Sequence, residues 1–188
     1  MGQQLPRPTM PIRTSGFICH SVASIFWVER VVIFSGDEIV TELTLLGISH
    51  VIWIPDSDLG QWEWALESSP IELVRVCREG EAWPLAAGLM VGGQHPIVVM
   101  QITGLFESGD ALRNVVHDLG MPVFAMIGAR NWRTPDSQDS AKTYGEPILR
   151  AWQIDYVIIE SKADRPKIQS HYQRCQAAQK PGIVLVGE

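Results

Sequence analysis

The sequence predicts an α/β domain: a doubly wound, mostly parallel six-stranded sheet with helices on both faces. Short apolar runs rich in Val and Ile recur along the chain, and segments with helical spacing lie between them. Because the runs are almost continuously apolar, we expect strands that are buried on both sides, as in a helix-covered parallel sheet. Regular alternation of strand and helix is typical of βαβ units, whose strands run parallel.

The elements follow from local signals. Ser35 and Glu38 have the spacing of a capping box, which predicts a helix over 37–47 that ends at Gly47, a residue that tolerates positive φ. The run "HVIWIP" that begins at His50 is a buried strand closed by a proline. The other strands are expected at 72–77, 96–101, 122–128, 155–160 and 182–186, and the other helices near 60–67, 80–91, 107–118, 145–152 and 164–178.

The chain of 188 residues is long enough for one domain with a substantial core. Residues 1–33 lie outside the alternating pattern, so we expect an N-terminal extension at 1–33 and a folded domain at 34–188. The apolar region in the extension is interrupted by Glu29 and Arg30, and its uncharged run is shorter than the ~20 residues of a membrane-spanning helix. We therefore expect no membrane association.

The composition excludes several classes of function. The net charge is −6 and Lys and Arg do not cluster, which argues against nucleic-acid binding. The three cysteines, Cys19, Cys77 and Cys175, are widely spaced, as expected for reduced thiols in a cytoplasmic protein. The chain has no CxxC or HxxxH pair, so we expect no metal site built from this chain alone.

Ligands of open α/β sheets bind beyond the carboxyl ends of the strands, which here are the predicted loops 55–60, 77–81, 101–109 and 128–140. Glu79 opens a helix there, so it either complements the helix dipole or acts in catalysis; from the residues alone, the dipole is the simpler explanation. Asp56 and Ser57 are equally consistent with an N-cap or a substrate contact. Gly104 indicates either a turn or a close approach to a ligand.

Taken together, these loops resemble the pyrimidine-binding domain of thiamine diphosphate enzymes, and most closely the phosphonopyruvate and sulfopyruvate decarboxylases. That group carries E-G-x-A-x-x-L-A-x-G, then M-Q-N-S-G-L-G-N, then I-G-W-R-G, and a V-P-D-S loop similar to "WIPDS" at 53–57 here. The likeness runs from about residue 36 to the end. The matching residues are Glu79, Gly80, Ala82, Leu85, Ala86 and Gly88; Met100, Gln101, Gly104 and Leu105; and Ile127, Gly128 and Arg130.

The resemblance implies roles for these positions. Glu79 would be the catalytic carboxyl that hydrogen-bonds the pyrimidine ring nitrogen and so promotes loss of the thiazolium C2 proton. The cofactor-binding residues would be Glu79, Thr103, Gly104 and Leu105. The residues that contact the substrate would be Asp56, Ser57 and Asp139. The substrate would be a 2-oxo acid such as sulfopyruvate or phosphonopyruvate, and the reaction a decarboxylation.

Enzymes of this kind bind the diphosphate through a metal held by a second domain with a G-D-G…N-N signature. This chain has no G-D-G, and its only asparagines are Asn114 and Asn131. The resemblance therefore implies an α subunit of a hetero-oligomer, active with a diphosphate-binding β subunit that holds Mg²⁺.

Two departures from the group's pattern leave a second interpretation open. Phe106 stands where a glycine is usual, and Asp139 stands where the group has a histidine. A catalytically inactive homologue, acting as a binding or assembly subunit, is the alternative. A flavodoxin-like module that binds flavin or a nucleotide is a third hypothesis.

Overall fold

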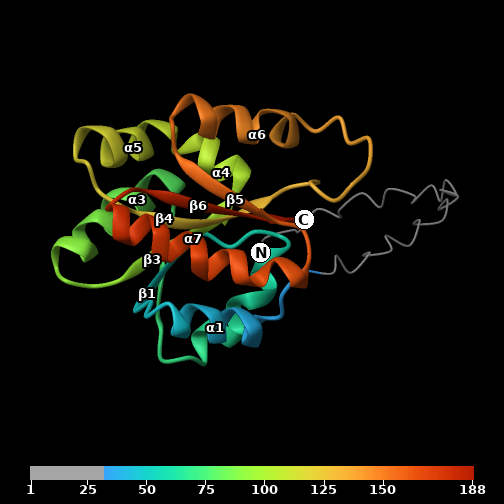
Figure 1. Cartoon of the computed structure of the whole chain (residues 1–188). Helices are drawn as coiled ribbons and strands as arrows, with labels where there is room; N and C mark the ends of the chain where they lie inside the picture. Colours follow the sequence, from blue (N-terminus) through green and yellow to red (C-terminus); the bar gives the residue numbers. More distant parts are fainter. Residues whose placement is uncertain (1–31) are drawn as a thin grey trace, which may run out of the picture.

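A single six-stranded sheet forms the centre of the computed structural model, which describes residues 32–188 (Figure 1). All neighbouring strands are parallel, in the order β2-β1-β3-β4-β6-β5. The predicted fold class is confirmed, and the sheet is parallel throughout. The strands are β1 His50–Trp53, β2 Glu72–Arg75, β3 Pro96–Gln101, β4 Phe124–Ala129, β5 Asp155–Ile159 and β6 Gly182–Gly187.

Helices cover both faces of this sheet. Buried residues of α1, α2 and α7 belong to the apolar cluster on one face, and those of α3, α4, α5 and α6 to the cluster on the other (Figure 1). The helical elements are α1 Gly36–Leu45, α2 Glu63–Glu67, α3 Glu79–Val91, α4 Ile102–Glu107, α5 Gly109–Arg113, α6 Ser140–Ala151 and α7 Arg165–Ala178, with the short turns η1 Leu59–Trp62, η2 Asn114–Asp118 and η3 Lys162–Asp164.

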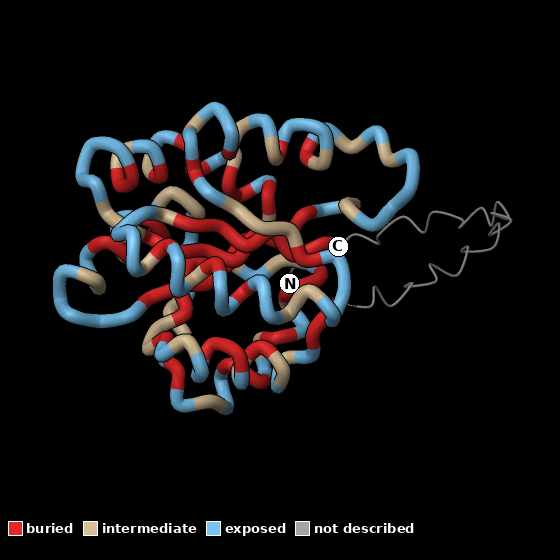
Figure 2. The backbone as a smooth tube through the Cα atoms, viewed as in Figure 1, coloured by how far each residue is buried: buried red, intermediate tan, exposed pale blue. Residues whose placement is uncertain are grey.

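The core has two halves because side chains alternate across each strand. In β3, Val98 and Met100 belong to the α3 side, whereas Ile97 and Val99 belong to the α1 side. The central strands β3, β4 and β6 are almost entirely buried, and exposure is found mainly on the outer surfaces of helices, in loops and on the edge strands (Figure 2). This pattern explains the continuous apolar runs in the sequence.

The predicted start and end of the first helix are confirmed. Glu38 N donates to Ser35 Oγ and Ser35 N donates to Glu38 Oε2, which completes the capping box. Gly47 follows the helix with φ +72°. Ile33 and Phe34 are buried beneath this helix, and Phe34 O accepts a 2.9 Å hydrogen bond from Trp62 Nε1. The chain is therefore packed against the domain from residue 33 onward.

Two helices begin earlier than predicted. The segment 101–109 is not a loop, because α4 starts at Ile102, directly after β3, with Gln101 as its N-cap. Likewise α6 begins at Ser140 rather than at 145. Gly104, which the sequence suggested as a turn, lies inside α4, and Gly145 lies inside α6; at both positions the missing Cβ permits close packing.

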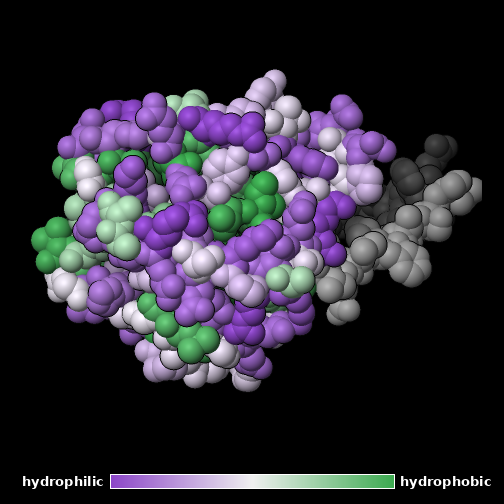
Figure 3. All heavy atoms as spheres, in the orientation of Figure 1, coloured by the Kyte–Doolittle hydropathy of each residue, from purple (hydrophilic) through white to green (hydrophobic). Residues whose placement is uncertain are grey.

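No helix of the described region is long and apolar enough to cross a membrane. The face seen in Figure 3 is mainly hydrophilic, with small separate hydrophobic patches. The expected extension lies almost entirely in residues 1–31, outside the described residues, and the division at 33/34 stays a prediction.

Candidate functional site

A solvent-open cavity of about 230 Å³ lies at the carboxyl ends of β1 and β3. The chain leaves β1 toward η1 and α2 on one face of the sheet and leaves β3 toward α4 on the other face. Such a switch point between neighbouring strands is where α/β sheets bind ligands. We call this cavity the β1–β3 pocket. Its lining residues are Ile54, Pro55, Asp56, Ser57, Glu79, Gln101 and Thr103.

The pocket brings together four of the residues that the sequence singled out. Asp56 and Ser57 come from the loop after β1, Glu79 is the first residue of α3, and Thr103 lies in the first turn of α4. These segments are 20 or more residues apart in the chain and meet only because their strands are neighbours in the sheet. Their functional roles stay predictions.

Glu79 lies half-buried at the N-terminus of α3 and packs on the backbone of α4. A Cβ added at Gly104 would stand 2.5 Å from Glu79 Cγ and 2.8 Å from Glu79 Oε1, so only glycine leaves room for this carboxylate. Within residues 32–188 the Glu79 carboxyl has no hydrogen bond or ion pair; the adjacent Arg78 pairs with Glu107 at 3.0 Å. The carboxyl is therefore available to a ligand.

The neighbouring Glu81 has a different task. It is exposed, and its Oε2 accepts a 3.1 Å hydrogen bond from the backbone N–H of Cys77, just before α3. The two carboxylates at the start of this helix thus have different surroundings: Glu81 accepts a hydrogen bond from the preceding backbone, whereas Glu79 lines the pocket.

Asp56 is both a backbone cap and a pocket residue. Its Oδ1 accepts hydrogen bonds of 2.7 Å from the backbone N–H groups of Asp58 and Leu59. Its Oδ2 is buried, and no group of the described chain bonds it. Burial outweighs the backbone hydrogen bonds and raises the pKa of Asp56 above its usual range, which favours a neutral carboxyl.

Two side chains at the end of β3 form a short hydrogen-bonded chain. Thr103 Oγ1 donates to Gln101 Oε1 at 3.1 Å, and Gln101 Nε2 donates to Glu188 Oε2 at 3.3 Å. Glu188 follows β6, so this series of hydrogen bonds runs from the pocket to the carboxyl end of β6. It orients the Gln101 amide at the pocket wall.

A buried polar link joins α3 to α4 behind the pocket. Trp83 Nε1 donates to Ser108 Oγ at 2.8 Å, and that hydroxyl donates to the carbonyl of Gly104 at 2.7 Å. Leu105, next in the chain, is fully buried in the core. Neither Gly104 nor Leu105, the other two predicted cofactor contacts, is among the residues that line the β1–β3 pocket, and their cofactor role stays a prediction.

Asp139 does not line the β1–β3 pocket; it caps α6. Its Oδ1 accepts from Ala141 N at 2.9 Å, and its Oδ2 contacts Asn131 Nδ2 at 2.6 Å and Arg130 Nε at 3.0 Å. The hydrogen bonds from Ala141 and Asn131 lower the pKa of this carboxyl, with Arg130 adding a smaller effect. A substrate contact by Asp139 stays a prediction. Phe106 packs against the core cluster and does not line the pocket either.

One group of side chains was missed by the sequence analysis. Asp155, His171 and Cys175 place one potential metal-ligand atom each within 4.8 Å of one another. His171 and Cys175 are four residues apart on α7 and so share a helix face, a signal that was present in the sequence. Asp155 could be added only from the fold, because it comes from β5.

No family model and no curated protein sequence matches the chain. Among solved structures, the chain is similar to one described as a split-gene transketolase, an inactive beta4 tetramer, with a TM-score of 0.60 and 12% sequence identity. The match covers 81% of this chain and 49% of that chain, so this chain spans about half the length of its structural neighbour. At this identity the likeness shows the fold alone: the chain has an α/β fold similar to that of part of the split-gene transketolase.

Proposed function

We propose that this chain is the pyrimidine-binding subunit of a thiamine diphosphate-dependent 2-oxo acid decarboxylase, completed by a separate diphosphate-binding subunit. The observation that carries the proposal is the Glu79 carboxyl, which lines the β1–β3 pocket and rests on Gly104 without a hydrogen bond or ion pair among the described residues. The transketolase-type fold is the architecture that the sequence resemblance implies.

The residues of the pocket fit an aminopyrimidine ring. Glu79 supplies a carboxyl for a ring nitrogen, while the Gln101 side-chain oxygen and the Thr103 hydroxyl are acceptors for an exocyclic amine. A cavity of about 230 Å³ has room for a ring of this size, and Ile54 and Pro55 form an apolar part of the cavity wall. The thiazolium portion of the cofactor, when bound, supplies the electron sink for loss of carbon dioxide.

Glu79 would hold and move a proton at the ring nitrogen. General acid–base catalysis requires the carboxyl to lie within hydrogen-bond reach of that atom and to be free of competing partners. Gly104 brings the helix backbone against the side chain, which restricts where the carboxyl can lie. Glu81 is bonded to the Cys77 amide and is not available for the same task.

The pocket is suited to the ring and not to the diphosphate. Asp56 and Glu79 are its acidic lining residues, and no Lys or Arg of the described chain lines it. A diphosphate needs cations, which in this proposal come from Mg²⁺ and the partner subunit.

The substrate proposed from the resemblance is a 2-oxo acid of the sulfopyruvate or phosphonopyruvate kind, which enters beside Asp56 and Ser57. An ionised aspartate would repel such an anion. Burial shifts the pKa of Asp56 upward, in the direction of the neutral form, which would not repel the anion. Ser57 is exposed at the same rim and offers a hydroxyl.

Reconstitution tests the proposal. The full chain serves as bait to isolate its partner, which is accepted only if its sequence carries G-D-G and N-N. The purified complex is then assayed for carbon dioxide release from sulfopyruvate, phosphonopyruvate and pyruvate, with and without Mg²⁺ and thiamine diphosphate. Carbon dioxide release that requires both Mg²⁺ and thiamine diphosphate supports the proposed decarboxylase. A complex that binds the cofactor without turnover supports the inactive homologue instead, and tight flavin binding by the chain alone supports the flavodoxin-like alternative.

A further inference from the structure

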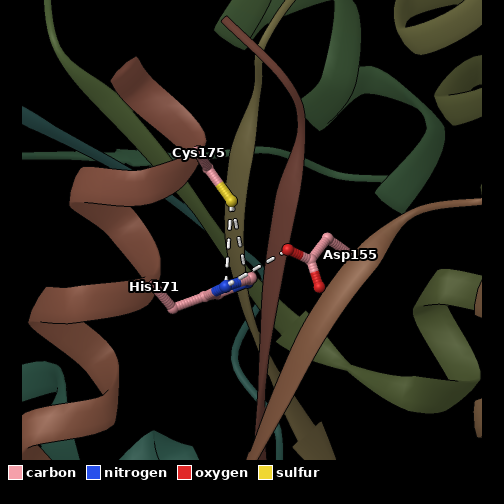
Figure 4. A group of neighbouring side chains, drawn as sticks. All are labelled: Asp155, His171 and Cys175. Carbon is pink, nitrogen blue, oxygen red and sulfur yellow. Dashed lines mark hydrogen bonds and ion pairs between the residues drawn. The ribbon is translucent and has the colours of Figure 1, made fainter. Parts of the chain in front are cut away.

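Asp155, His171 and Cys175 form a side-chain group (Figure 4). It lies at the amino end of β5, whereas the β1–β3 pocket lies at the carboxyl ends of β1 and β3. Asp155 is the first residue of β5 and pairs in register with Gly182, the first residue of β6. His171 and Cys175 lie one turn apart on α7, and their side chains point toward these strand ends. The group is therefore separate from the site discussed above.

The spacing of the three side chains suits a first-row transition metal. Zinc binds sulfur at about 2.3 Å and nitrogen or oxygen at about 2.0–2.2 Å, so two ligands of a tetrahedral site stand about 3.4–3.6 Å apart. Here His171 Nδ1 lies 3.7 Å from Cys175 Sγ and 3.9 Å from Asp155 Oδ2. Movements of a few tenths of an ångström would bring these two pairs to that separation, and all three ligand atoms already lie within 4.8 Å of one another.

The two ligands on the helix are deeply buried. The relative exposure is 0% for His171 and 2% for Cys175. A Cβ at Gly182 would lie 2.6 Å from Cys175 Sγ, so the glycine that opens β6 is what makes room for the sulfur. Burial lowers the pKa of His171 below its usual value, with Asp155 opposing this effect and Arg174 adding to it. Burial also raises the pKa of the Cys175 thiol, so formation of a thiolate there requires the metal ion.

A cation already occupies the junction of two of these ligands. Arg174 Nη2 lies 2.8 Å from His171 Nδ1 and 3.1 Å from Asp155 Oδ2. The guanidinium thus marks a point where the carboxylate and the ring nitrogen together stabilise positive charge. The Arg174 side chain is 55% exposed, so it can swing into solvent and leave that position to a metal ion.

We propose that Asp155, His171 and Cys175 form a binding site for Zn²⁺ or a similar borderline-soft divalent ion, with water as the fourth ligand. On binding, the Cys175 thiol gives its proton to solvent and its sulfur bonds the metal as a thiolate; Arg174 leaves the His171 nitrogen; no oxidation or reduction occurs. The ion would tie α7 to the start of β5. This inference does not depend on the proposed function.

Cobalt(II) titration of the metal-free full chain under reducing conditions tests the site, because a cobalt–thiolate bond gives a charge-transfer absorption that nitrogen and oxygen ligands do not. We expect this band to saturate at one equivalent and to disappear when Zn²⁺ is added. Absence of the band at saturating cobalt would overturn the proposal.

Variants assign the band to these residues. Cys175→Ser should abolish it, and Cys77→Ser and Cys19→Ser, at the other two thiols, should leave it unchanged. Because Cys175 is buried, the exposed Asp155→Asn provides a variant less apt to disturb folding; it should weaken cobalt binding at least about tenfold. Arg174→Ala should tighten binding severalfold. A band that survives Cys175→Ser, unchanged affinity in Asp155→Asn, or weaker binding in Arg174→Ala would each contradict the assignment.

Discussion

The Glu79 side chain lies directly against the backbone of Gly104, so that any Cβ at position 104 would stand 2.5 Å from Glu79 Cγ. This contact joins the start of α3 to the first turn of α4 and sets where the carboxyl lies in the β1–β3 pocket. In the proposed function, Gly104 is a positioning residue for Glu79 as well as a backbone contact for the cofactor.

Gly104→Ala should therefore displace the Glu79 carboxyl and weaken thiamine diphosphate binding by the reconstituted complex about tenfold or more, the loss expected for a hydrogen bond to a charged group. Cofactor titration followed by tryptophan fluorescence measures the change. Gly88→Ala is the matched control, because Gly88 is exposed in α3 with no atom within 4 Å of its added Cβ. Equal affinity of the Gly104→Ala and wild-type complexes would contradict the positioning role.

Asp56 should give the stability of the chain a specific pH dependence. Its folded-state pKa is raised by burial above the ordinary 3.8, so the folded state takes up a proton before the unfolded state does as the pH falls. The stability of wild type relative to Asp56→Asn should consequently rise as the pH drops through the folded-state pKa toward 3.8. Urea unfolding of both proteins over a pH series measures this difference. A difference that stays constant, or changes in the opposite direction, would refute a raised pKa.

Ser108 should contribute to stability out of proportion to its size. Its hydroxyl receives the Trp83 indole N–H and donates to the Gly104 carbonyl, in a fully buried setting. Ser108→Ala leaves a buried donor unsatisfied and should lower the free energy of unfolding by about 1–3 kcal/mol. Ser170→Ala, at an exposed serine of α7, should change it by less than about 0.5 kcal/mol. Similar urea midpoints for the two variants would show that the link has no such role.

Asp139 offers a test of a structural against a substrate role. Its pKa is lowered by the Ala141 amide and Asn131, so its ionised form stabilises the fold above about pH 3.8, and this contribution is lost as the pH falls through the lower folded-state pKa. Asp139→Ala should reduce Tm by a few degrees at neutral pH, with a smaller gap at acid pH, whereas Asp139→Asn keeps the cap. An unchanged Tm in Asp139→Ala, with a raised KM for the oxo acid in the complex, would favour the substrate role.

The sheet and its helices could be predicted from the sequence because strands that are buried on both sides consist of continuous apolar runs, such as "PIVVMQ" in β3 and "GIVLV" in β6. The prediction misplaced the starts of α4 and α6. Gly104 and Gly145 have no distinctive local signal: each is required by a contact from another element, with Glu79 and with Ile102 respectively.

Contacts between elements that are distant in the sequence also limited the prediction of the sites. The carboxyl-end rule brings Asp56, Glu79 and Thr103 to one edge of the sheet, and the pocket contains all three. Strand order was not available from the sequence, so the rule could not exclude Asp139, which lies on the loop after β4, from the same pocket. For the same reason Asp155 could not be paired with His171.

The central claim is that the Glu79 carboxyl shares a proton with an aminopyrimidine nitrogen. The most direct test compares cofactor-dependent carbon dioxide release by complexes that carry Glu79→Gln or Glu81→Gln, two matched substitutions two residues apart on α3. Loss of general acid–base catalysis predicts a fall in kcat of about 10²–10⁴-fold for Glu79→Gln and near wild-type turnover for Glu81→Gln. Full activity of the Glu79→Gln complex would contradict the account.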